Sequence, residues 1–331
     1  MKCPTCEKDC LQPAAQVLSG IDSLYMACPR CPPEPNLDKG APLRELPRTA
    51  NRCPSCGRAP LDLVMLEALD VMVECGIRDA GESLRSVGTP LVEIGFPMAY
   101  PPRLGGRSLI IVGDRLTGEA ASRLMEIPEI KGVIQSAGIP GVVDRSRGSR
   151  EGELLAGCDL RADLVQSAFG DLLIYKSQAR IHIEFSRQGA PKVRIVESLF
   201  FGGAFKEVVD GYCGPGTLGL VCALAGAKRV VLNDIWLPAV ENVMMNLEAN
   251  RDLLGIQEIQ RPEAAVSLVG GSPVLVGLAT GDCRIEVYHG DLRKLFHRAG
   301  PADLCLIDPF PGSDTREAER ACSSCRKIVI I

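Results

Sequence analysis

The sequence lacks a long uninterrupted hydrophobic run. Its longest stretch without a charged residue, 264–281, spans 18 positions but contains Gly270, Gly271, Pro273 and Gly277. We expect a strand, a Gly-Gly turn and a second strand there rather than a membrane helix. The first residues also place no apolar segment behind a basic one, so we expect no signal peptide and a cytoplasmic location.

Charge of one sign, aromatic side chains and histidines are also scarce. The 37 Lys and Arg against 41 Asp and Glu give a net charge of −4, and there are only 1 Trp, 5 Tyr, 8 Phe and 3 His. Nothing in this balance indicates a polyanion-binding surface, so nucleic acid could be bound only through a local patch. The 46% hydrophobic and 24% charged content excludes a mostly disordered chain, and 331 residues correspond to about two domains.

Cysteine, in contrast, is abundant, with 15 residues in all. Three Cys-Pro-x-Cys knuckles recur every 25 residues: Cys3-Pro-Thr-Cys6, Cys28-Pro-Arg-Cys31 and Cys53-Pro-Ser-Cys56. Two thiolates separated by two residues bind one tetrahedral ion, and a second pair completes a four-Cys shell. The pattern therefore predicts a zinc-ribbon-like head over 1–60 with structural Zn²⁺. An iron–sulfur cluster or a redox Cys-x-x-Cys is the weaker alternative.

The six knuckle thiols fill one site and leave two sulfurs over. We expect the first site to use Cys3, Cys6, Cys28 and Cys31. The partners of Cys53 and Cys56 stay open, with Cys10, or Cys322 and Cys325, as candidates. Closed four-Cys sites contribute folding free energy and no chemistry.

The middle of the chain reads as two segments. Apolar residues recur every three or four positions from Leu61 to Val73, which predicts a helix in a helical linker region over 61–106. A Pro- and Gly-rich stretch precedes an apolar strand at 108–112. A helix at 117–125, a strand at 132–135 and β-rich runs at 171–175 and 180–185 follow. Residues 107–200 are therefore expected to form a small α+β domain.

The C-terminal segment, 201–331, predicts an open α/β sheet. Four apolar strands at 206–210, 229–234, 284–289 and 303–308 lead into Asp210, Asp234, Asp291 and Asp308, and a fifth is expected at 327–331. A glycine-rich turn and a helix follow the first of them, so backbone N–H groups there can approach a ligand closely. Ligands bind at the carboxyl edge of such sheets, which makes the four acids the candidate site.

These residues resemble class I S-adenosylmethionine-dependent methyltransferases. The resemblance implies a Rossmann-like fold in which the segment from Asp210 to Gly219 holds the methionine part, Asp234 and the adjacent Ile235 hold the ribose, and Asp291 with Leu292 receives the adenine amine. The members of the first motif expected to contact the cofactor are Asp210, Tyr212, Cys213, Gly214, Gly216 and Thr217. A dehydrogenase is less consistent, because its Gly-x-Gly-x-x-Gly fingerprint begins one residue after the strand and it carries no Asp-Pro sequence on strand four.

The fourth strand ends in Asp308-Pro309-Phe310-Pro311, which looks like a variant of the (Asp/Asn)-Pro-Pro-aromatic motif of that class. The Asp308 carboxylate and the Pro309 carbonyl would accept hydrogen bonds from an amine or ring N–H and orient its lone pair toward the methyl group. Asp308 would also border the cofactor. Phe310 would stack on a planar substrate, with a packing role as the alternative.

A closer resemblance, over about 109–308, is to archaeal tRNA (guanine-37 N1)-methyltransferases and their wybutosine-pathway relatives. It rests on the Gly132-Val-Ile-Gln-Ser segment, the Gly138-Ile-Pro-Gly141 loop, the Glu153-Leu-Leu-Ala-Gly157 segment and the run 170–185 before the first motif. It implies a tRNA base nitrogen as methyl acceptor and Arg187 as an active-site arginine. The chain departs from the family at 166–170, where Gln-Ser-Ala-Phe-Gly replaces His-Arg-Glu-Asn-Gly.

Other functions remain open at this stage. The same cofactor could serve a methyltransferase for a protein side chain or a small molecule, which the near-neutral charge and few aromatics favour, or an aminocarboxypropyl transferase. A cofactor-binding scaffold without turnover is the fallback. The class usually continues through an antiparallel strand pair after strand five, which this sequence lacks. We therefore expect another part of the chain or a second copy, in a homodimer, to cover the exposed edge of 327–331.

Overall fold

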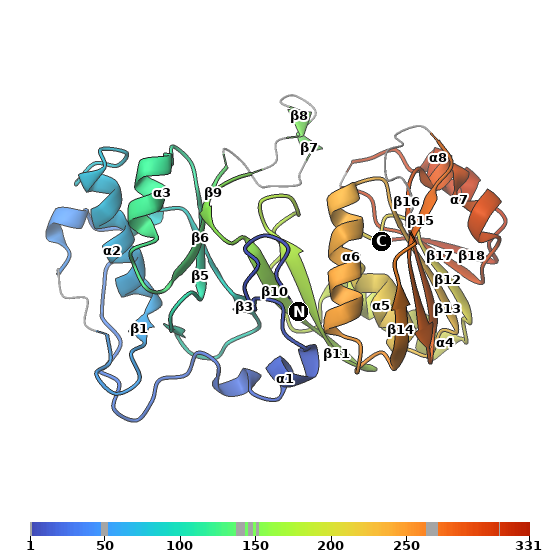
Figure 1. Cartoon of the computed structure of the whole chain (residues 1–331), viewed down its shortest axis with the longest axis horizontal. Helices are drawn as coiled ribbons and strands as arrows, with labels where there is room; N and C mark the ends of the chain where they lie inside the picture. Colours follow the sequence, from blue (N-terminus) through green and yellow to red (C-terminus); the bar gives the residue numbers. More distant parts are fainter. Residues whose placement is uncertain are drawn as a thin grey trace. The chain divides into compact units, whose positions relative to one another are not determined.

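The computed structural model describes residues 2–47, 52–136, 143–144, 148–149, 152–262, 271–310 and 312–331 (Figure 1). The chain divides into two compact units that interleave in sequence. The first comprises Met1–Cys10, Gly20–Ala162 and Ser177–Phe185, and the second Leu11–Ser19, Asp163–Lys176 and Ser186–Ile331. Within the described ranges, no helix has the length and apolar character needed to cross a membrane.

The first unit is built on a four-stranded sheet of order β2-β5-β6-β9. Its strands are β2 (Thr89–Val92), β5 (Leu109–Gly113), β6 (Ile130–Gln135) and β9 (Glu153–Gly157), with β5 and β6 parallel and the outer strands antiparallel to them. Helices α2 (Leu61–Glu74) and α3 (Gly118–Leu124) bury their apolar faces in the core that this sheet shares. The helices and strands expected at 61–73, 108–112, 117–125 and 132–135 are confirmed.

Short elements complete the first unit. They are η1 (Ile21–Ser23), η2 (Leu43–Glu45), η3 (Leu84–Ser86), the pair β1 (Ala59–Pro60) and β4 (Arg103–Leu104), and the pair β7 (Val143–Asp144) and β8 (Gly148–Ser149). Strand β3 (Ile94–Gly95) joins a hairpin of β10 (Leu160–Ser167) and β11 (Gly170–Ser177), which continues into the second unit. The strand expected at 180–185 is wrong, because a turn in which Arg180 and Ile181 donate to the Ser177 carbonyl ends β11. The Gly138–Gly141 loop lies outside the described residues.

The second unit contains a seven-stranded sheet of order β14-β15-β16-β13-β12-β17-β18. The strands are β12 (Glu207–Asp210), β13 (Arg229–Asp234), β14 (Ile256–Gln260), β15 (Val274–Gly281), β16 (Arg284–His289), β17 (Leu304–Ile307) and β18 (Lys327–Ile330). Five of them, β16, β13, β12, β17 and β18, are parallel. Numbered in chain order, these five follow the sequence 3-2-1-4-5, which is the doubly wound, Rossmann-like arrangement. The predicted fold class is confirmed.

An antiparallel strand pair is present, but it lies beside β16 and not beside β18. Strand β15 is the second strand expected within 264–281, whereas residues 264–270 of that stretch lie outside the described residues. Strand β18 is an edge of the sheet, and the Ile330 side chain on it is 46% exposed.

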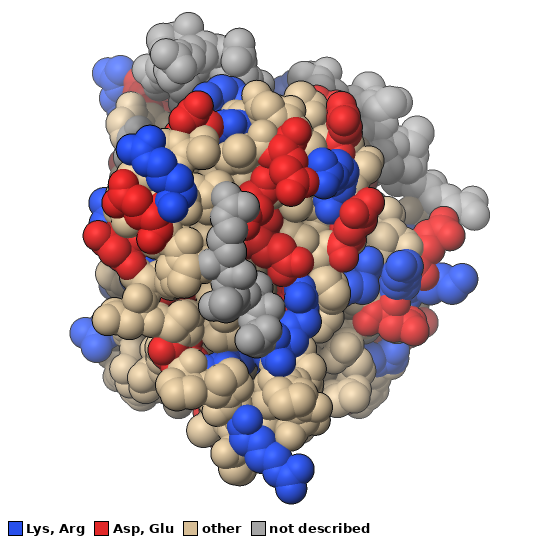
Figure 2. Space-filling view, turned by 90° about the vertical axis from the view of Figure 1, so that its left-hand side faces the viewer, with Lys and Arg blue, Asp and Glu red and all other residues tan. Residues whose placement is uncertain are grey.

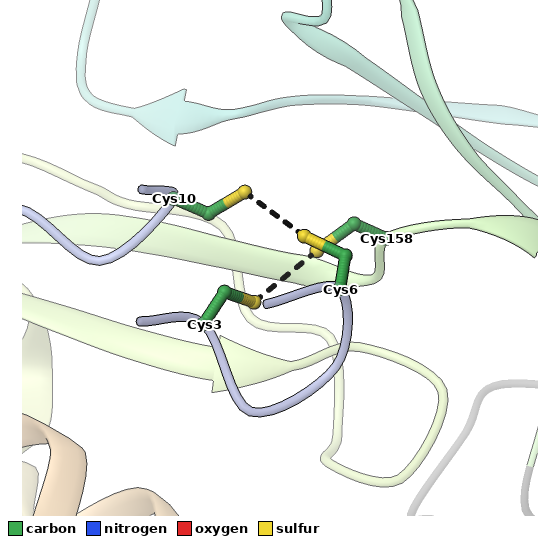
Figure 3. A group of neighbouring side chains, drawn as sticks. All are labelled: Cys3, Cys6, Cys10 and Cys158. Carbon is green, nitrogen blue, oxygen red and sulfur yellow. Dashed lines mark hydrogen bonds between the residues drawn. The ribbon is translucent and has the colours of Figure 1, made fainter. Parts of the chain in front are cut away.

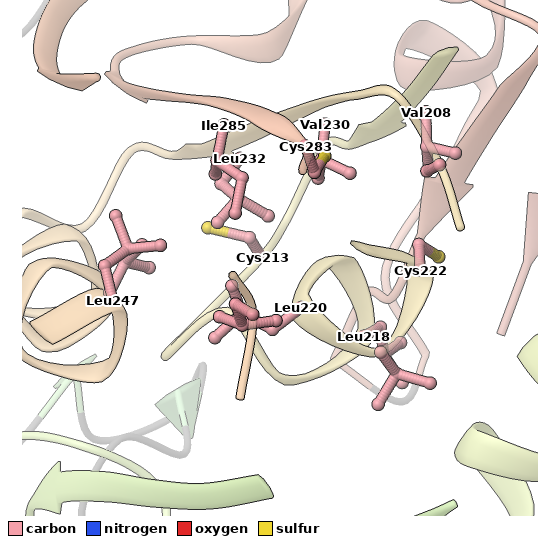
Figure 4. Packing of buried hydrophobic residues seen from close by; sticks show 14 of the residues in the cluster. Val208, Cys213, Leu218, Leu220, Cys222, Val230, Leu232, Leu247, Cys283 and Ile285 are labelled. Carbon is pink, nitrogen blue, oxygen red and sulfur yellow. The ribbon is translucent and has the colours of Figure 1, made fainter. Parts of the chain in front are cut away.

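Helices cover both faces of this sheet. Alternate strand residues such as Val208 and Val230 pack with α4 (Pro191–Gly202), α5 (Thr217–Leu224) and α6 (Leu237–Ala249), as Figure 4 shows for part of this core. Val209 and Val231 face α7 (Leu292–Ala299) and α8 (Arg316–Ala321). Parallel strands buried on both faces require such continuous apolar runs. The remaining helix of this unit is the short α1 (Ala14–Leu18).

Two buried asparagines, one in α6 and one directly after it, bind the backbone of β11. Asn246 accepts the Tyr175 N–H (2.7 Å) and donates to the Tyr175 carbonyl (3.0 Å), and Asn250 makes the same pair of bonds to Leu173 (2.9 and 2.8 Å). Each carboxamide thus takes the place of a neighbouring strand, since it offers one acceptor and one donor to the same residue. These bonds attach β11 to the sheet domain within the second unit.

Candidate cofactor site and metal centres

The four predicted acids follow strands at one edge of the sheet. Asp210 ends β12, Asp234 ends β13, Asp308 comes directly after β17, and Asp291 follows β16 by two residues. The strand registers pair Asp210 with Leu306 and Asp234 with His289, so the four strands reach this edge together. The strand order reverses between β12 and β17, and such a switch point is where doubly wound sheets bind ligands.

The turn between β12 and α5 is tied to the end of β13. The Asp234 Oδ2 atom accepts the Gly214 N–H at 2.9 Å, and the Cys213 N–H donates to the Asn233 carbonyl at 3.0 Å. Asn233 also donates to the carbonyls of Gly211 (3.1 Å) and Gly290 (3.2 Å). The loops after β12 and β16 are therefore held in place before any ligand arrives.

Glycines give this turn its path. Gly214 and Gly216 have φ values of 51° and 90°, in the left-handed region that glycine adopts without steric cost. At Gly219 a Cβ atom would lie 2.1 Å from the Leu232 side chain, so α5 packs closer to β13 than any other residue would permit. Thr217, the first residue of α5, directly follows Gly216.

Asp210 is buried at the start of α5. Its Oδ2 atom accepts the Gly219 N–H at 2.9 Å, whereas the buried Oδ1 atom accepts no hydrogen bond within the described part of the chain. Burial, followed by the charge of Asp308, raises the pKa of Asp210 to about 7. A buried oxygen with spare acceptor capacity fits a ligand that carries an amine or hydroxyl donor.

The Asp210→Asn substitution is expected to stabilise the cofactor-free protein at pH 8. The pKa in the folded state, about 7, lies above the ordinary value of 3.8, so the stability that protonation provides is complete below about pH 4 and is lost as the pH rises to 7. Asparagine does not ionise, so the variant avoids the stability that Asp210 loses on ionisation, which amounts to at most about 4 kcal/mol. Urea unfolding at pH 5 and pH 8 measures the difference, with the exposed Asp252→Asn as control. An equal effect at both pH values would contradict the assignment.

Asp234 fits a dihydroxyl group such as a ribose. Its Oδ1 atom accepts the Trp236 N–H at 2.8 Å, and each carboxylate oxygen retains a further lone pair for an incoming hydroxyl. Burial raises the pKa of this carboxyl. The next two side chains, Ile235 and Trp236, are 54% and 38% exposed. The site thus offers a partly buried hydroxyl acceptor beside apolar surface, which is the combination that an adenosine requires.

Asp291 and Leu292 have structural contacts of their own. The Asp291 carboxylate accepts the Arg293 N–H at 2.9 Å at the start of α7, and the Arg293 guanidinium, which binds it at 2.6 Å, lowers its pKa. The charge of Asp291, together with burial, raises the pKa of Tyr212 on the turn after β12. Leu292 is buried against Gly211, where a Cβ atom would lie 2.7 Å from its side chain. Asp291 and Leu292 thus both interact with residues of the turn after β12.

The Asp308 carboxylate forms an ion pair with Lys192, whose Nζ lies 2.7 Å from Oδ2. Sequence reasoning missed Lys192, because it lies 116 positions away near the start of α4 and belongs to no motif. Phe310 is 47% exposed and Pro309 is partly buried beside Asp308, while Pro311 lies outside the described residues. Arg187 is exposed in the segment before α4.

Two cysteines of the segment after β12 are buried in apolar surroundings. Cys213, in the turn after β12, and Cys222, in α5, lie in the same core, and burial raises the pKa of both thiols well above its usual value (Figure 4). A thiol of this kind is protonated at neutral pH and packs as a small apolar residue.

The predicted composition of the first metal site is wrong. The four sulfurs of Cys28, Cys31, Cys53 and Cys56 lie within 4.8 Å of one another, and so do those of Cys3, Cys6, Cys10 and Cys158. The knuckles at 3 and 28 belong to different groups: one group combines the knuckles at 28 and 53, and the other combines the knuckle at 3 with Cys10 and Cys158. Cys322 and Cys325 join neither group, since they are buried with Cys305 under α8.

The group of Cys28, Cys31, Cys53 and Cys56 has the dimensions of a zinc site. Sulfur separations are 3.7 Å from Cys28 to Cys53 and 3.6 Å from Cys31 to both Cys28 and Cys56. Tetrahedral zinc with bonds of about 2.3 Å requires sulfurs roughly 3.8 Å apart. Backbone N–H groups, first that of Cys56, lower the pKa of Cys53 to about 6, which provides a thiolate.

Comparisons with known proteins complete these observations. No family model and no curated protein matches the chain. Among solved structures, TYW2 of Pyrococcus horikoshii in complex with MeSAdo is 13% identical, with 80% of this chain and 76% of that chain covered and a TM-score of 0.43. The tRNA (uracil-54, C5)-methyltransferase of Pyrococcus abyssi is 16% identical, with 69% and 47% covered and a TM-score of 0.42.

A third similar structure is the tRNA m1G37 methyltransferase of M. jannaschii, which is 16% identical, with 67% and 55% covered and a TM-score of 0.37. The chain spans 55%, 40% and 56% of the first three solved chains that it matches. Since these TM-scores are low, the function has to be inferred from the chain's own residues.

Proposed function

We propose that this protein is an S-adenosylmethionine-dependent methyltransferase. The observation that carries the proposal is the edge of the seven-stranded sheet, where Asp210, Asp234, Asp291 and Asp308 follow four parallel strands at the switch point. The glycine turn beside them is already fixed by Asp234 and Asn233. S-adenosylmethionine would supply an electrophilic methyl group on a sulfonium.

The chain's own residues would hold the two reactants in near-attack geometry, the main requirement for an in-line transfer. Asp234 would accept the ribose hydroxyls, and the Oδ1 atom of Asp210 would accept a donor from the methionine part. Asp308 and the Pro309 carbonyl would accept the N–H of the substrate, which directs its lone pair toward the methyl group. Phe310, being exposed, offers a face on which a planar base stacks.

The proposed substrate is a tRNA base nitrogen, which rests on the sequence resemblance over 109–308. On the face that Figure 2 shows, the coloured basic and acidic side chains lie interspersed and form no continuous basic surface. If RNA binding involves several phosphate contacts, it should weaken steeply with salt.

A doubly labelled cofactor tests the reaction and the substrate together. The protein is incubated with methyl-³H and carboxyl-¹⁴C S-adenosylmethionine and with bulk tRNA, soluble protein or small molecules from cells that lack the gene. We expect ³H alone in tRNA. Carbon-14 in tRNA would indicate aminocarboxypropyl transfer. Label in protein or small molecules would show that the substrate belongs to that class and is not tRNA. Cofactor binding without transfer of either label would indicate a cofactor-binding scaffold without turnover.

The Lys192→Met substitution is expected to move the acid limb of the kcat/KM profile to higher pH by about one unit. An ammonium at 2.7 Å favours the ionised form of Asp308, so its loss raises the pH at which that carboxylate becomes available. Rates measured from pH 3.5 to 9 test this, with Lys206→Met at the opposite edge of the sheet as control. An unchanged profile would show that Asp308 does not titrate in the reaction.

Two further features belong to this proposal. Cys28, Cys31, Cys53 and Cys56 are proposed to hold a structural Zn²⁺, which adds folding free energy and takes no part in transfer.

The exposed edge of β18 is the proposed contact of a homodimer, and light scattering of the purified protein distinguishes it from a monomer.

A further inference from the structure

Cys3, Cys6, Cys10 and Cys158 form the second four-thiol group, in which one residue comes from a distant part of the sequence (Figure 3). The Cys3 and Cys158 sulfurs are 3.5 Å apart, and those of Cys6 and Cys10 are 3.4 Å apart. Both distances lie just inside the roughly 3.8 Å edge of a zinc–thiolate tetrahedron. Unlike the group of Cys28, Cys31, Cys53 and Cys56, this group contains two buried members, Cys3 and Cys158.

The knuckle of this group has the same backbone as the knuckle at Cys53. The Cys3 N–H donates to the Lys8 carbonyl (2.8 Å) and the Glu7 N–H to the Cys3 carbonyl (2.9 Å). At the other knuckle, the Cys53 N–H donates to the Arg58 carbonyl (2.9 Å) and the Gly57 N–H to the Cys53 carbonyl (2.8 Å). The residue after the second cysteine is left-handed in both, with φ 57° at Glu7 and 71° at Gly57. The first knuckle thus keeps a ligand-type turn even without glycine.

Two glycines bring Cys158 to this knuckle. Gly132 on β6 pairs with Gly157 at the end of β9, and the Cys158 N–H donates to the Lys131 carbonyl at 2.9 Å. A Cβ atom at Gly132 would lie 2.2 Å from the Cys158 carbonyl, and one at Gly157 would lie 2.2 Å from the Lys131 carbonyl. Any side chain at either position would push Cys158 away from the other three thiols.

Neighbouring polar groups match a charged centre. The Thr5 hydroxyl, inside the knuckle, donates to the Asp159 carboxylate at 3.0 Å, and Asp159 also accepts the Ala179 N–H at 3.2 Å. The Lys131 ammonium is buried, donates to the Leu160 carbonyl at 2.7 Å, and interacts electrostatically with Cys10 and Cys158. A divalent ion with four thiolates carries a net charge of −2, and the buried Lys131 ammonium, which also pairs with Glu93 at 2.5 Å, offsets part of it.

We propose that Cys3, Cys6, Cys10 and Cys158 bind a second Zn²⁺, independent of the ion at Cys28, Cys31, Cys53 and Cys56. This ion joins the first ten residues to the connection between β9 and β10. It closes a loop between residues 155 positions apart, so it constrains the unfolded chain as a long-range cross-link does. The cysteine-rich segment is therefore an integral part of the first unit and is not an appended head.

Metal analysis of the purified full-length chain tests this without cofactor or RNA. We expect two zinc ions per chain in the unmodified protein and in the Cys75→Ser control, and one in Cys158→Ser and in Cys56→Ser. We also expect Cys158→Ser to lower the melting temperature by several degrees. One zinc ion in the unmodified protein, or two retained in Cys158→Ser, would overturn the proposal.

Native mass spectrometry of the unmodified protein provides a reading that does not depend on a variant folding. A chain that carries two zinc ions supports the second site. A chain with one zinc ion and a mass lower by two hydrogen atoms contains a disulfide among these thiols instead, and an iron–sulfur cluster would give its own mass and colour. Either of these results contradicts the proposal.

Discussion

The Asp308→Ala variant is expected to lose methyl transfer by about 100- to 1,000-fold in kcat, while it still binds the cofactor within a few-fold of the unmodified protein. Asp308 lies directly after β17, where its carboxylate would accept the substrate N–H. A positioned acid or base contributes typically 10² to 10⁴ in rate. The transfer of ³H from the methyl-labelled cofactor to tRNA, together with calorimetric titration of the cofactor, separates the two effects.

Asp314→Ala is the matched control, because Asp314 is exposed six residues further along the chain and pairs with Arg316. It should transfer methyl groups at the unmodified rate. Full activity in Asp308→Ala would remove Asp308 from the mechanism and leave transfer to positioning alone.

The Asp234→Ala variant is expected to bind S-adenosylhomocysteine about 100-fold more weakly. A carboxylate that accepts two ribose hydroxyls contributes roughly 1.5 to 3 kcal/mol per bond, part of which solvent replaces in the variant. The substitution also removes the acceptor of the Gly214 and Trp236 N–H groups, so the turn after β12 loses its attachment to β13. Isothermal titration calorimetry measures the affinity directly.

The exposed Asp282→Ala, at the far edge of the sheet, controls for a general loss of stability. Asp234→Asn should bind with intermediate affinity, because the amide keeps one acceptor oxygen for the two N–H groups that the carboxylate serves. Equal affinity in the alanine variant and the unmodified protein would place the cofactor elsewhere.

The sheet of the second unit was predictable because its signals are local. Each parallel strand is an apolar run buried on both faces, and an acid follows each of the first four, so pattern alone located β12, β13, β16 and β17. The partners of the acids were not predictable. Lys192 meets Asp308 across 116 positions, and Arg293 occupies the Asp291 carboxylate through a helix-capping contact that the motif does not encode.

The metal ligands show the same division between local and distant signals. Spacing identified the knuckles, but it could not decide which knuckles share an ion. Cys158 belongs to no Cys-x-x-Cys pair, and its role depends on the approach of Gly132 and Gly157 between two strands. The Ala-Gly-Cys sequence at 156–158 gives no hint of this approach, because a glycine there is compatible with an ordinary strand end.

The attachment of β11 to α6 limits how this protein can be taken apart. A fragment that begins at Ser186 contains the whole seven-stranded sheet, yet it omits the backbone groups that Asn246 and Asn250 bind. Each carboxamide would keep one donation, to the Pro215 or the Asn246 carbonyl, but would lose its two bonds to β11, and a hydrogen bond lost in this way costs about 0.5 to 1.5 kcal/mol. Leu172 and Ile174 would leave the same core. The Rossmann-like part is thus not an independent folding unit. Recombination or truncation that preserves every residue from 186 onward would still destabilise it.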